Sequence, residues 1–364
     1  MHIFEKNNLK MNGLYIVYNA GAKYEDIHQL GTMHLMEHMI CKRLDDLQDE
    51  FTNRNIVFNA YTTQDKVVVF VTGLISELNA DLKTRVVRRL TDGVFADEDS
   101  FIRERSVVLQ EYYNYFDDTV YGNILNYTRQ KFNDFSVIGN AECILNFSYD
   151  DALQIFDKYF KKPSEIIEVG KEKTDFSFVE YNGIEQFEKK LKFKNYKNKL
   201  EIIPESVNNS TVFLHTKKQV SKRDYPYILI LNTILTHGLN SVLYQELREK
   251  RGLVYGVGPY DNLQVFSMYA ITDSDNAQEV SDVMNDVIHN LDKYITQERF
   301  NDVINCNKIQ LEIDKLFAYK HPKMLNADLP SKFSSIKKFD KVTLEDVLNV
   351  GKKYFDNSVT VVFN

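Results

Sequence analysis

Three side chains within five positions of the chain combine two metal-binding groups with a carboxylate. His34, Glu37 and His38 form the pattern HxxEH, the inverse of the commoner HExxH. Residues four apart on a helix lie on one face, about one turn from each other, so both imidazoles can bind a single metal ion. Glu37 then lies beside that ion, where it can take a proton from a water molecule. The pattern predicts a zinc site with His34 and His38 as ligands and Glu37 as the general base.

A catalytic zinc ion usually has three protein ligands and one open position, so the two histidines need a third partner. The segment Phe101–Glu111 has the apolar spacing of a helix, and it carries Glu104 and Glu111 two turns apart on one face. One of these carboxylates can bind the metal ion while the other hydrogen-bonds a ligand imidazole. The spacing leaves open which carboxylate has which role.

The competing interpretation is a helix that carries two solvated histidines and a surface glutamate. The chain has 8 histidines in 364 residues, and such a composition produces HxxEH by chance in about one chain in a hundred. Taken alone, Glu104 and Glu111 would also be interpreted as a solvated helix face. The two patterns together favour the metal site.

A capped helix followed by a strand recurs near the end of each half of the chain. Residues 147–160 align with residues 342–355, and each copy has a capping residue with an acid three positions later (Ser148 and Asp151; Thr343 and Asp346). Each helix leads into a β-rich run (Ile166–Val169; Val359–Phe363). The repeat predicts an α+β fold with two homologous domains, each an antiparallel sheet with helices packed on it. We expect a catalytic zinc-binding domain over 1–175, a polar linker over 176–199 and a homologous domain without a metal site over 200–364.

Both halves are expected to contain the order strand, helix, strand. β-branched and aromatic residues predict strands in the first half at Gly13–Tyr18 and Lys66–Thr72, on either side of a helix that carries the motif over Leu30–Phe51. In the second half the predicted strands are Ser210–His215 and Gln264–Ala270, on either side of a helix over Tyr225–Leu235.

Composition narrows the classes of partner. The formal charge of −7 comes from 52 acidic and 45 basic residues without a long basic run, so no nucleic-acid partner is expected. The longest apolar stretch, Tyr225–Leu235, is far shorter than the roughly 20 residues of a membrane-spanning helix. The start of the chain lacks the charged and apolar regions of a secretory signal, and three scattered cysteines fit a reducing compartment. We therefore expect a cytoplasmic protein without a membrane partner.

The motif and four further segments resemble the pitrilysin/insulinase family of zinc metallopeptidases, which includes the processing peptidases, and the resemblance spans nearly the whole chain. The matching segments are Gly31–Met39, Phe58–Thr63, Glu104–Glu111, Gly139–Glu142 and Leu247–Tyr255. By this resemblance Glu111 is the third zinc ligand and Glu104 the supporting carboxylate.

The resemblance also implies where a substrate is held. Asn59 and Ala60 match a strand whose edge receives the substrate backbone, a mode of binding that favours extended peptides. Arg248 and Tyr255 match a pair that reaches the active site from the second half and holds substrate carbonyls, with the tyrosine near the developing oxyanion. Arg251 is the nearest rival to Arg248.

The second half is expected to have no metal site of its own. The offset of 195 positions carries the five metal-site residues of the first half onto side chains that cannot form such a site (Leu229, Asn232, Thr233, Arg299 and Cys306). The resemblance implies a zinc endopeptidase with one Zn²⁺ per chain that acts on short or unfolded peptides. That this substrate is a precursor or leader peptide is a hypothesis that no sequence feature supports. Members of the family enclose substrate between four such domains, so a dimer is implied, either a homodimer or a heterodimer with a related subunit. The alternative function is a non-catalytic partner subunit of a heterodimeric processing peptidase.

Overall fold

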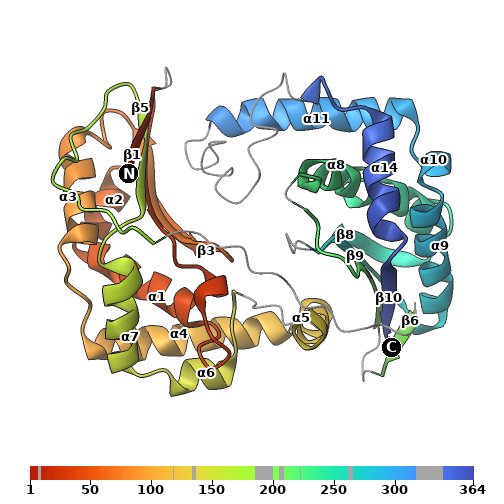
Figure 1. Ribbon diagram of the computed structural model, residues 1–364, viewed down its shortest axis with the longest axis horizontal. Coiled ribbons are helices and arrows are strands. Elements are labelled where there is room, and N and C mark those ends of the chain that lie inside the picture. The colour runs from red at the N-terminus through yellow and green to blue at the C-terminus, as the bar shows by residue number, and fades with distance from the viewer. Residues whose placement is uncertain are drawn as a thin grey trace. The chain divides into compact units, whose positions relative to one another are not determined.

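The computed structural model describes residues 1–6, 10–117, 119–132, 137–184, 200–204, 209–221, 223–260, 265–316 and 339–364. These residues divide into two compact units, each with its own five-stranded sheet (Figure 1). The first unit contains the described residues of 1–117, 137–184 and 314–316, and the second contains those of 119–132, 200–313 and 339–364. Residues 185–199 of the expected linker lie outside the described residues, and the boundaries 1–175 and 200–364 stay a prediction.

The two sheets have the same strand order and the same strand directions. The first sheet has the order β1-β5-β2-β4-β3, and its strands are β1 (His2–Lys6), β2 (Met11–Tyr18), β3 (Val57–Thr62), β4 (Val67–Leu74) and β5 (Glu165–Gly170). The second has the order β6-β10-β7-β9-β8, and its strands are β6 (Leu200–Ile203), β7 (Asn209–Thr216), β8 (Val254–Pro259), β9 (Ser267–Asp273) and β10 (Ser358–Phe363). The predicted α+β fold of two homologous halves is confirmed.

One edge of each sheet differs from the predicted antiparallel arrangement. β1 pairs with β5 in parallel, as β6 does with β10, whereas all the other neighbouring strands are antiparallel. A parallel pair needs a long crossover between its strands. Here that crossover is nearly the whole unit, so no local turn signal in the sequence could predict the pairing.

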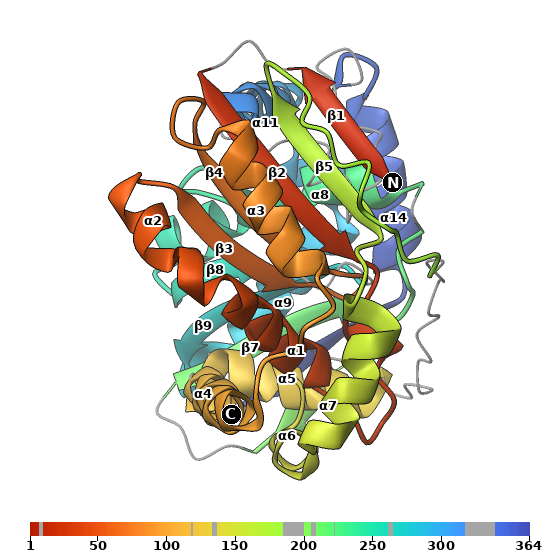
Figure 2. The ribbon, with the colours of Figure 1, turned by 90° about the vertical axis from the view of Figure 1, so that its left-hand side faces the viewer.

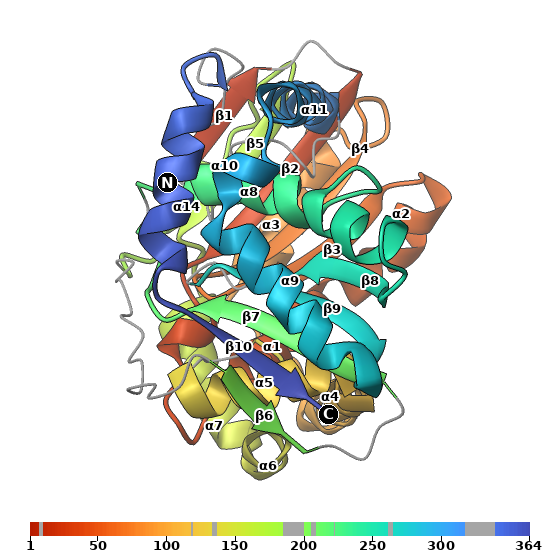
Figure 3. The same ribbon diagram turned by 90° about the vertical axis from the view of Figure 1, so that its right-hand side faces the viewer.

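Helices cover one face of each sheet. The helices of the first unit are α1 (Thr32–Cys41), α2 (Gln48–Asn53), α3 (Ala80–Thr91), α4 (Glu98–Asp117), α6 (Ala141–Asn146) and α7 (Tyr149–Ile155). Figure 2 shows α1, α2 and α3 in front of the strands. The helices of the second unit are α5 (Thr119–Phe132), α8 (Tyr225–Thr236), α9 (Ala277–His289), α10 (Leu291–Tyr294), α11 (Gln297–Leu316) and α14 (Leu344–Phe355). Figure 3 shows α8, α9 and α14 on the near face of its sheet. No helix in the described part of the chain is both long enough and apolar enough to cross a membrane.

The repeated helix caps are present as predicted. Ser148 caps α7 and Thr343 caps α14, and each forms a reciprocal capping box with the acid three positions later. The chain runs from each helix into the strand that was predicted after it, β5 or β10. The first copy differs in its last turn, because Phe156–Phe160 is π-helical whereas α14 stays α-helical to Phe355.

The central strands of the sheets, such as β2, β4, β7 and β10, are apolar because both of their faces are buried. Along β2, Leu14 and Ile16 pack into the core under the helices, whereas Tyr15 and Val17 belong to a smaller cluster on the other face. In the second unit α5 covers that other face, where its Ile124 packs with residues of β7 and β10. A helix that precedes the predicted linker in the sequence therefore packs into the second unit.

The predicted helix over Leu30–Phe51 is wrong in its extent. α1 ends at Cys41, a 3-10 segment follows over Lys42–Leu47, and α2 begins at Gln48. Apolar residues three positions apart share a face in both kinds of helix, so over this short segment their spacing could not separate the two. In the folded chain Arg43 at the break donates a hydrogen bond to Asp92 at 2.6 Å.

Candidate metal centre

α1 presents its polar stripe away from the core. Its buried residues are Thr32, Met33, Leu35, Met36, Met39 and Ile40. Because a helix repeats every 3.6 residues, the remaining positions place His34, Glu37, His38 and Cys41 together on the opposite side. All four line one pocket of about 410 Å³.

The start of α1 is fixed by contacts from outside the helix. Gly31 precedes the helix in a left-handed conformation and provides no side-chain cap. The buried carboxylate of Glu25 instead accepts hydrogen bonds from the N–H groups of Gly31, at 3.0 Å, and Met33, at 2.7 Å. An anionic acceptor at this end also suits the helix dipole. Glu25 therefore holds the first turn from which His34 projects.

The two histidines and Glu111 bring three ligand atoms to one place. Nε2 of His34 lies 3.4 Å from Oε2 of Glu111, and Nε2 of His38 lies 3.8 Å from the same oxygen. One ligand atom from each residue lies within 4.8 Å of the others. Two imidazoles and one carboxylate are a zinc donor set that leaves a fourth position open. The donor set therefore fits Zn²⁺.

The opposite nitrogens of the two imidazoles have different surroundings. Nδ1 of His38 lies 3.0 Å from Oε2 of Glu104, a contact that fixes the ring when Nδ1 carries the proton. Nδ1 of His34 is buried and has no hydrogen-bond partner among the described residues. The fold thus separates the two acids that spacing left equivalent, because Glu111 faces both Nε2 atoms and Glu104 faces the far side of His38.

Burial, together with neighbouring charges and hydrogen bonds, shifts the pKa values of three side chains at the site. Burial and the neighbouring His38 lower the pKa of His34 to about 4, so its imidazole is neutral at pH 7, the form that binds a metal ion. Burial would raise the pKa of Glu104, but hydrogen bonds with His38 and Lys42 hold it below its usual value. Burial raises the pKa of Glu37, and Glu111 adds to this, whereas Thr62 and His38 act in the opposite direction.

Glu37 is oriented by a contact that the sequence did not reveal. The hydroxyl of Thr62 donates a hydrogen bond to Oε2 of Glu37 at 2.6 Å. Thr62 is the last residue of β3 and lies within the segment Phe58–Thr63 on which the family resemblance rests. This bond uses one carboxylate oxygen and leaves Oε1 for other partners.

The same pocket reaches the edge of the first sheet. Among the described strands, β3 is an outer strand that pairs only with β4, and its residues Phe58, Asn59 and Ala60 line the pocket. The N–H of Ala60 donates to the side-chain oxygen of its neighbour Asn59 at 2.8 Å rather than to β4. An outer strand with an N–H turned away from the sheet can accept an added strand.

Arg248 and Tyr255 lie together in the second unit. Arg248 donates a hydrogen bond to the backbone oxygen of Tyr255 and stacks on the ring of Tyr244, with its guanidinium carbon 5.3 Å from the ring centre. The Tyr255 side chain is 57% exposed, and its hydroxyl donates to Asp273 at 3.0 Å, which raises the pKa of Tyr255. Arg251, the rival to Arg248, forms an ion pair with Glu246, in which Nη1 lies 2.8 Å from Oε2.

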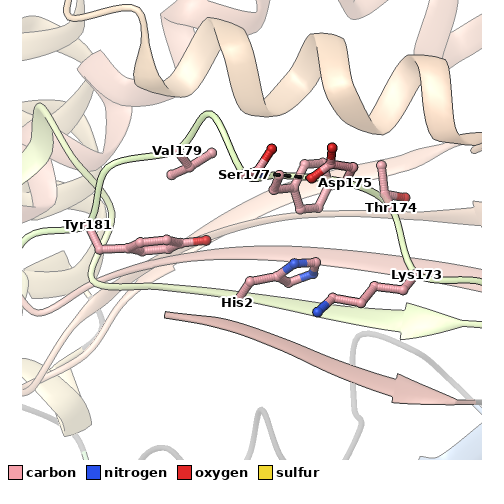
Figure 4. Close-up of a pocket in the computed structure, with 8 residues that line it drawn as sticks. His2, Lys173, Thr174, Asp175, Ser177, Val179 and Tyr181 are labelled. Carbon is pink, nitrogen blue, oxygen red and sulfur yellow. Dashed lines mark hydrogen bonds between the residues drawn. The ribbon is translucent and has the colours of Figure 1, made fainter.

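A second pocket of about 480 Å³ lies in the first unit beside β1, and Figure 4 shows the residues that line it, among them His2, Lys173 and Tyr181. Nε2 of His2 lies 3.1 Å from the buried carboxylate of Glu168, which also accepts a hydrogen bond from Lys83 at 2.6 Å. These contacts join β1, β5 and α3. They account for the buried charges here as a structural ion-pair network.

Comparison with known proteins finds similarities that cover from less than half to all of the chain. A family model described as "Peptidase M16 inactive domain" matches residues 146–306. An "Uncharacterized zinc protease" of Rickettsia felis is 22% identical, and the alignment covers 95% of this chain and 90% of that protein. The beta subunit of the human mitochondrial-processing peptidase is 26% identical over 43% of this chain and 33% of its own length. In fold, the chain resembles the crystal structure of a protease from Helicobacter pylori, with a TM-score of 0.82, 17% identity and coverage of 100% and 96% of the two chains.

Proposed function

The chain belongs to the peptidase M16 family, the zinc peptidases with the inverted motif that its sequence resembles, and from this membership we propose that it is a zinc-dependent endopeptidase acting on short or unfolded peptides. The observation that carries the proposal is the meeting of His34, His38 and Glu111 within 4.8 Å, with Glu37 on the same face of α1. A Zn²⁺ ion held by these three residues would polarise the scissile carbonyl and lower the pKa of water toward about 7.

The proposed chemistry of the protein itself centres on Glu37. Its carboxylate takes a proton from the water whose oxygen attacks the scissile carbonyl carbon. It then gives that proton to the leaving nitrogen as the C–N bond breaks. Thr62 supports this role by holding Oε2 while Oε1 remains available. Glu104 supports the orientation of His38.

The proposed substrate lies along β3 as an added strand. Asn59 and Ala60 would present the strand edge, and this mode of binding requires an extended peptide backbone. By the family resemblance, Arg248 and Tyr255 are proposed to hold substrate carbonyls, with Tyr255 near the developing oxyanion. A dimer, whether of identical or related subunits, and a cytoplasmic location stay predictions from the sequence, as does a precursor or leader peptide as the substrate.

A non-catalytic partner subunit is the second candidate. It is favoured by the description of the matching family model as an inactive domain. That match begins at residue 146, however, and His34, Glu37, His38, Glu104 and Glu111 all precede it. The description therefore applies to a part of the chain that does not contain the proposed metal ligands.

Zinc removal tests the choice between these two candidates. The purified chain is expected to contain about one zinc ion per chain and to cleave unfolded peptides in a mixed peptide library, while leaving folded proteins intact. A chelator should abolish cleavage and added Zn²⁺ should restore it, because the ion supplies the electrophile. Cleavage is followed by mass spectrometry. A chain with full zinc, in its native oligomeric state, that cleaves no peptide supports the non-catalytic subunit instead.

The strand-addition part of the proposal predicts a selective effect of Ala60→Pro. Proline removes the N–H that faces away from β4, and an outer strand tolerates proline at such a position. Loss of one backbone hydrogen bond to substrate should lower kcat/KM by about 3- to 10-fold, with unchanged zinc content. Ala60→Ser keeps the N–H and should behave as the unaltered chain. Equal kcat/KM for the proline and serine variants would contradict substrate pairing at this edge.

A further inference from the structure

We propose that Lys42 is a positioning residue for the metal centre, which it serves by fixing the carboxylate that orients His38. The inference rests on the proposed zinc site and extends it outward by one contact. Lys42 is absent from the HxxEH pattern and follows it by four positions, directly after the end of α1.

A single carboxylate joins Lys42 to the ligand imidazole. Oε2 of Glu104 lies 3.0 Å from Nδ1 of His38, and Oε1 of the same group lies 3.0 Å from Nζ of Lys42. A carboxylate held at one oxygen can still rotate about its terminal bond, which is a broad torsion. Contacts at both oxygens restrict that rotation. Lys42 therefore limits the directions from which Glu104 can accept a hydrogen bond from Nδ1 of His38.

The position of Lys42 follows from the local fold. His38 and Lys42 are four positions apart, and the backbone N–H of Lys42 still bonds to the carbonyl of His38, so both side chains project toward the same side. α4 lies along that side and brings Glu104 to the pair. Lys42 is the first residue of the 3-10 segment, yet its backbone N–H keeps this α-helical hydrogen bond. Lys42 therefore shares the rigid frame of α1.

Charge gives Lys42 a role that no neighbouring side chain can take. Four acids line the pocket, Glu37, Asp45, Glu104 and Glu111, whereas Lys42 is the one lysine or arginine among the described residues that line it. Asp45 also lies 3.6 Å from Lys42, but its side chain is 58% exposed, against 13% for Glu104. A pair with an exposed partner contributes little. The contact with the less exposed Glu104 is the one expected to matter.

The test is the zinc affinity of the purified full-length chain, measured by competition with a chromophoric chelator. Outer contacts to a ligand histidine typically change metal affinity by about 10- to 100-fold, so Glu104→Gln should weaken zinc binding by that factor. Lys42→Met acts one contact further out and should weaken it by about 3- to 10-fold. Lys42→Arg keeps the charge and should restore most of the affinity. Lys161→Met is the matched control, because Lys161 pairs with Asp157 on the surface of the same unit.

Two further readouts separate positioning from a general structural effect. In the Glu104→Gln background, Lys42→Met should change zinc affinity by less than about 2-fold, because residues that act through one another are not additive. In the metal-free chain, nitrogen NMR should find the His38 proton on Nδ1, and Lys42→Met should increase the other tautomer. If the lysine only stabilises the fold, Lys42→Met leaves the tautomer ratio of His38 unchanged.

The outcomes distinguish this inference from the proposed function. If the unaltered chain binds no zinc, both the proposed function and the proposed role of Lys42 are wrong. If the chain binds zinc but Lys42→Met binds it equally well, only the role of Lys42 is overturned. Additive effects of Lys42→Met and Glu104→Gln would likewise overturn it, and leave the zinc site in place.

Discussion

Glu37→Gln is expected to lower kcat for peptide hydrolysis by about 10²- to 10⁴-fold, the range typical for loss of a general base. Glutamine has nearly the same shape and can still accept the hydrogen bond from Thr62, which is 2.6 Å long in the unaltered chain. Its amide cannot accept the proton of the attacking water. Glu37 does not belong to the group of ligand atoms formed by His34, His38 and Glu111, so bound zinc should stay at about one ion per chain.

Zinc content and cleavage must therefore be measured on the same preparation. The matched control is Glu98→Gln, which makes the same chemical change at an exposed position in the first turn of α4. It should retain full zinc and full kcat. A Glu37→Gln chain that still cleaves peptides within a few-fold of the normal rate would show that another group accepts the proton. Loss of zinc from this variant would instead assign Glu37 to the metal ligands.

Gly139→Ala is expected to destabilise the first unit by roughly 2–5 kcal/mol, because two unfavourable effects coincide. Gly139 has φ of +76°, a left-handed conformation that side chains other than glycine adopt at a cost. An added Cβ would also lie only 2.1 Å from Cα of Gly31, which itself has φ of +92°. Both clashing atoms belong to the backbone or are fixed to it, so no side-chain rotation can relieve the contact.

Gly93→Ala is the matched control, since Gly93 has φ of +77° but its Cβ would meet only the Lys161 side chain at 3.6 Å. This variant should lose about 1 kcal/mol from conformation alone. Urea denaturation midpoints measure both changes. Because Gly31 directly precedes α1, Gly139→Ala should also weaken zinc binding, whereas Gly93→Ala should not. Equal destabilisation by the two variants would mean that the close approach of Gly31 and Gly139 does not matter for stability.

The contrast between these glycines explains a segment that the sequence singled out without a reason. Gly139–Glu142 was recognised by family resemblance alone. In the folded chain Asn140 caps α6 through its side chain, and its N–H bonds to the carbonyl of Leu30 at 3.1 Å. The segment thus holds the loop before α1 and fixes the position of the helix that carries the candidate metal ligands.

Local sequence features determined much about this protein. The polar stripe of His34, Glu37 and His38 follows from helical periodicity, and the repeated capping boxes at Ser148 and Thr343 follow from residues three positions apart. The main strands follow from their composition. These features depend on contacts between near neighbours in the chain, so their spacing is sufficient to predict them. They were enough to indicate a metal site and two homologous α+β halves.

Tertiary structure decided the features that depend on residues far apart in the chain. Glu104 and Glu111 have the same residue type and share a helix face, and only the packing of α4 against α1 places Glu111 at the Nε2 atoms and Glu104 at Nδ1 of His38. The contact from Thr62 to Glu37 and that from Lys42 to Glu104 arise in the same way. The parallel pairing of β1 with β5 and the packing of α5 into the second unit also leave no local signal. Periodicity predicts on which face of a helix a side chain lies. The residue that it contacts is decided by which element packs against that face.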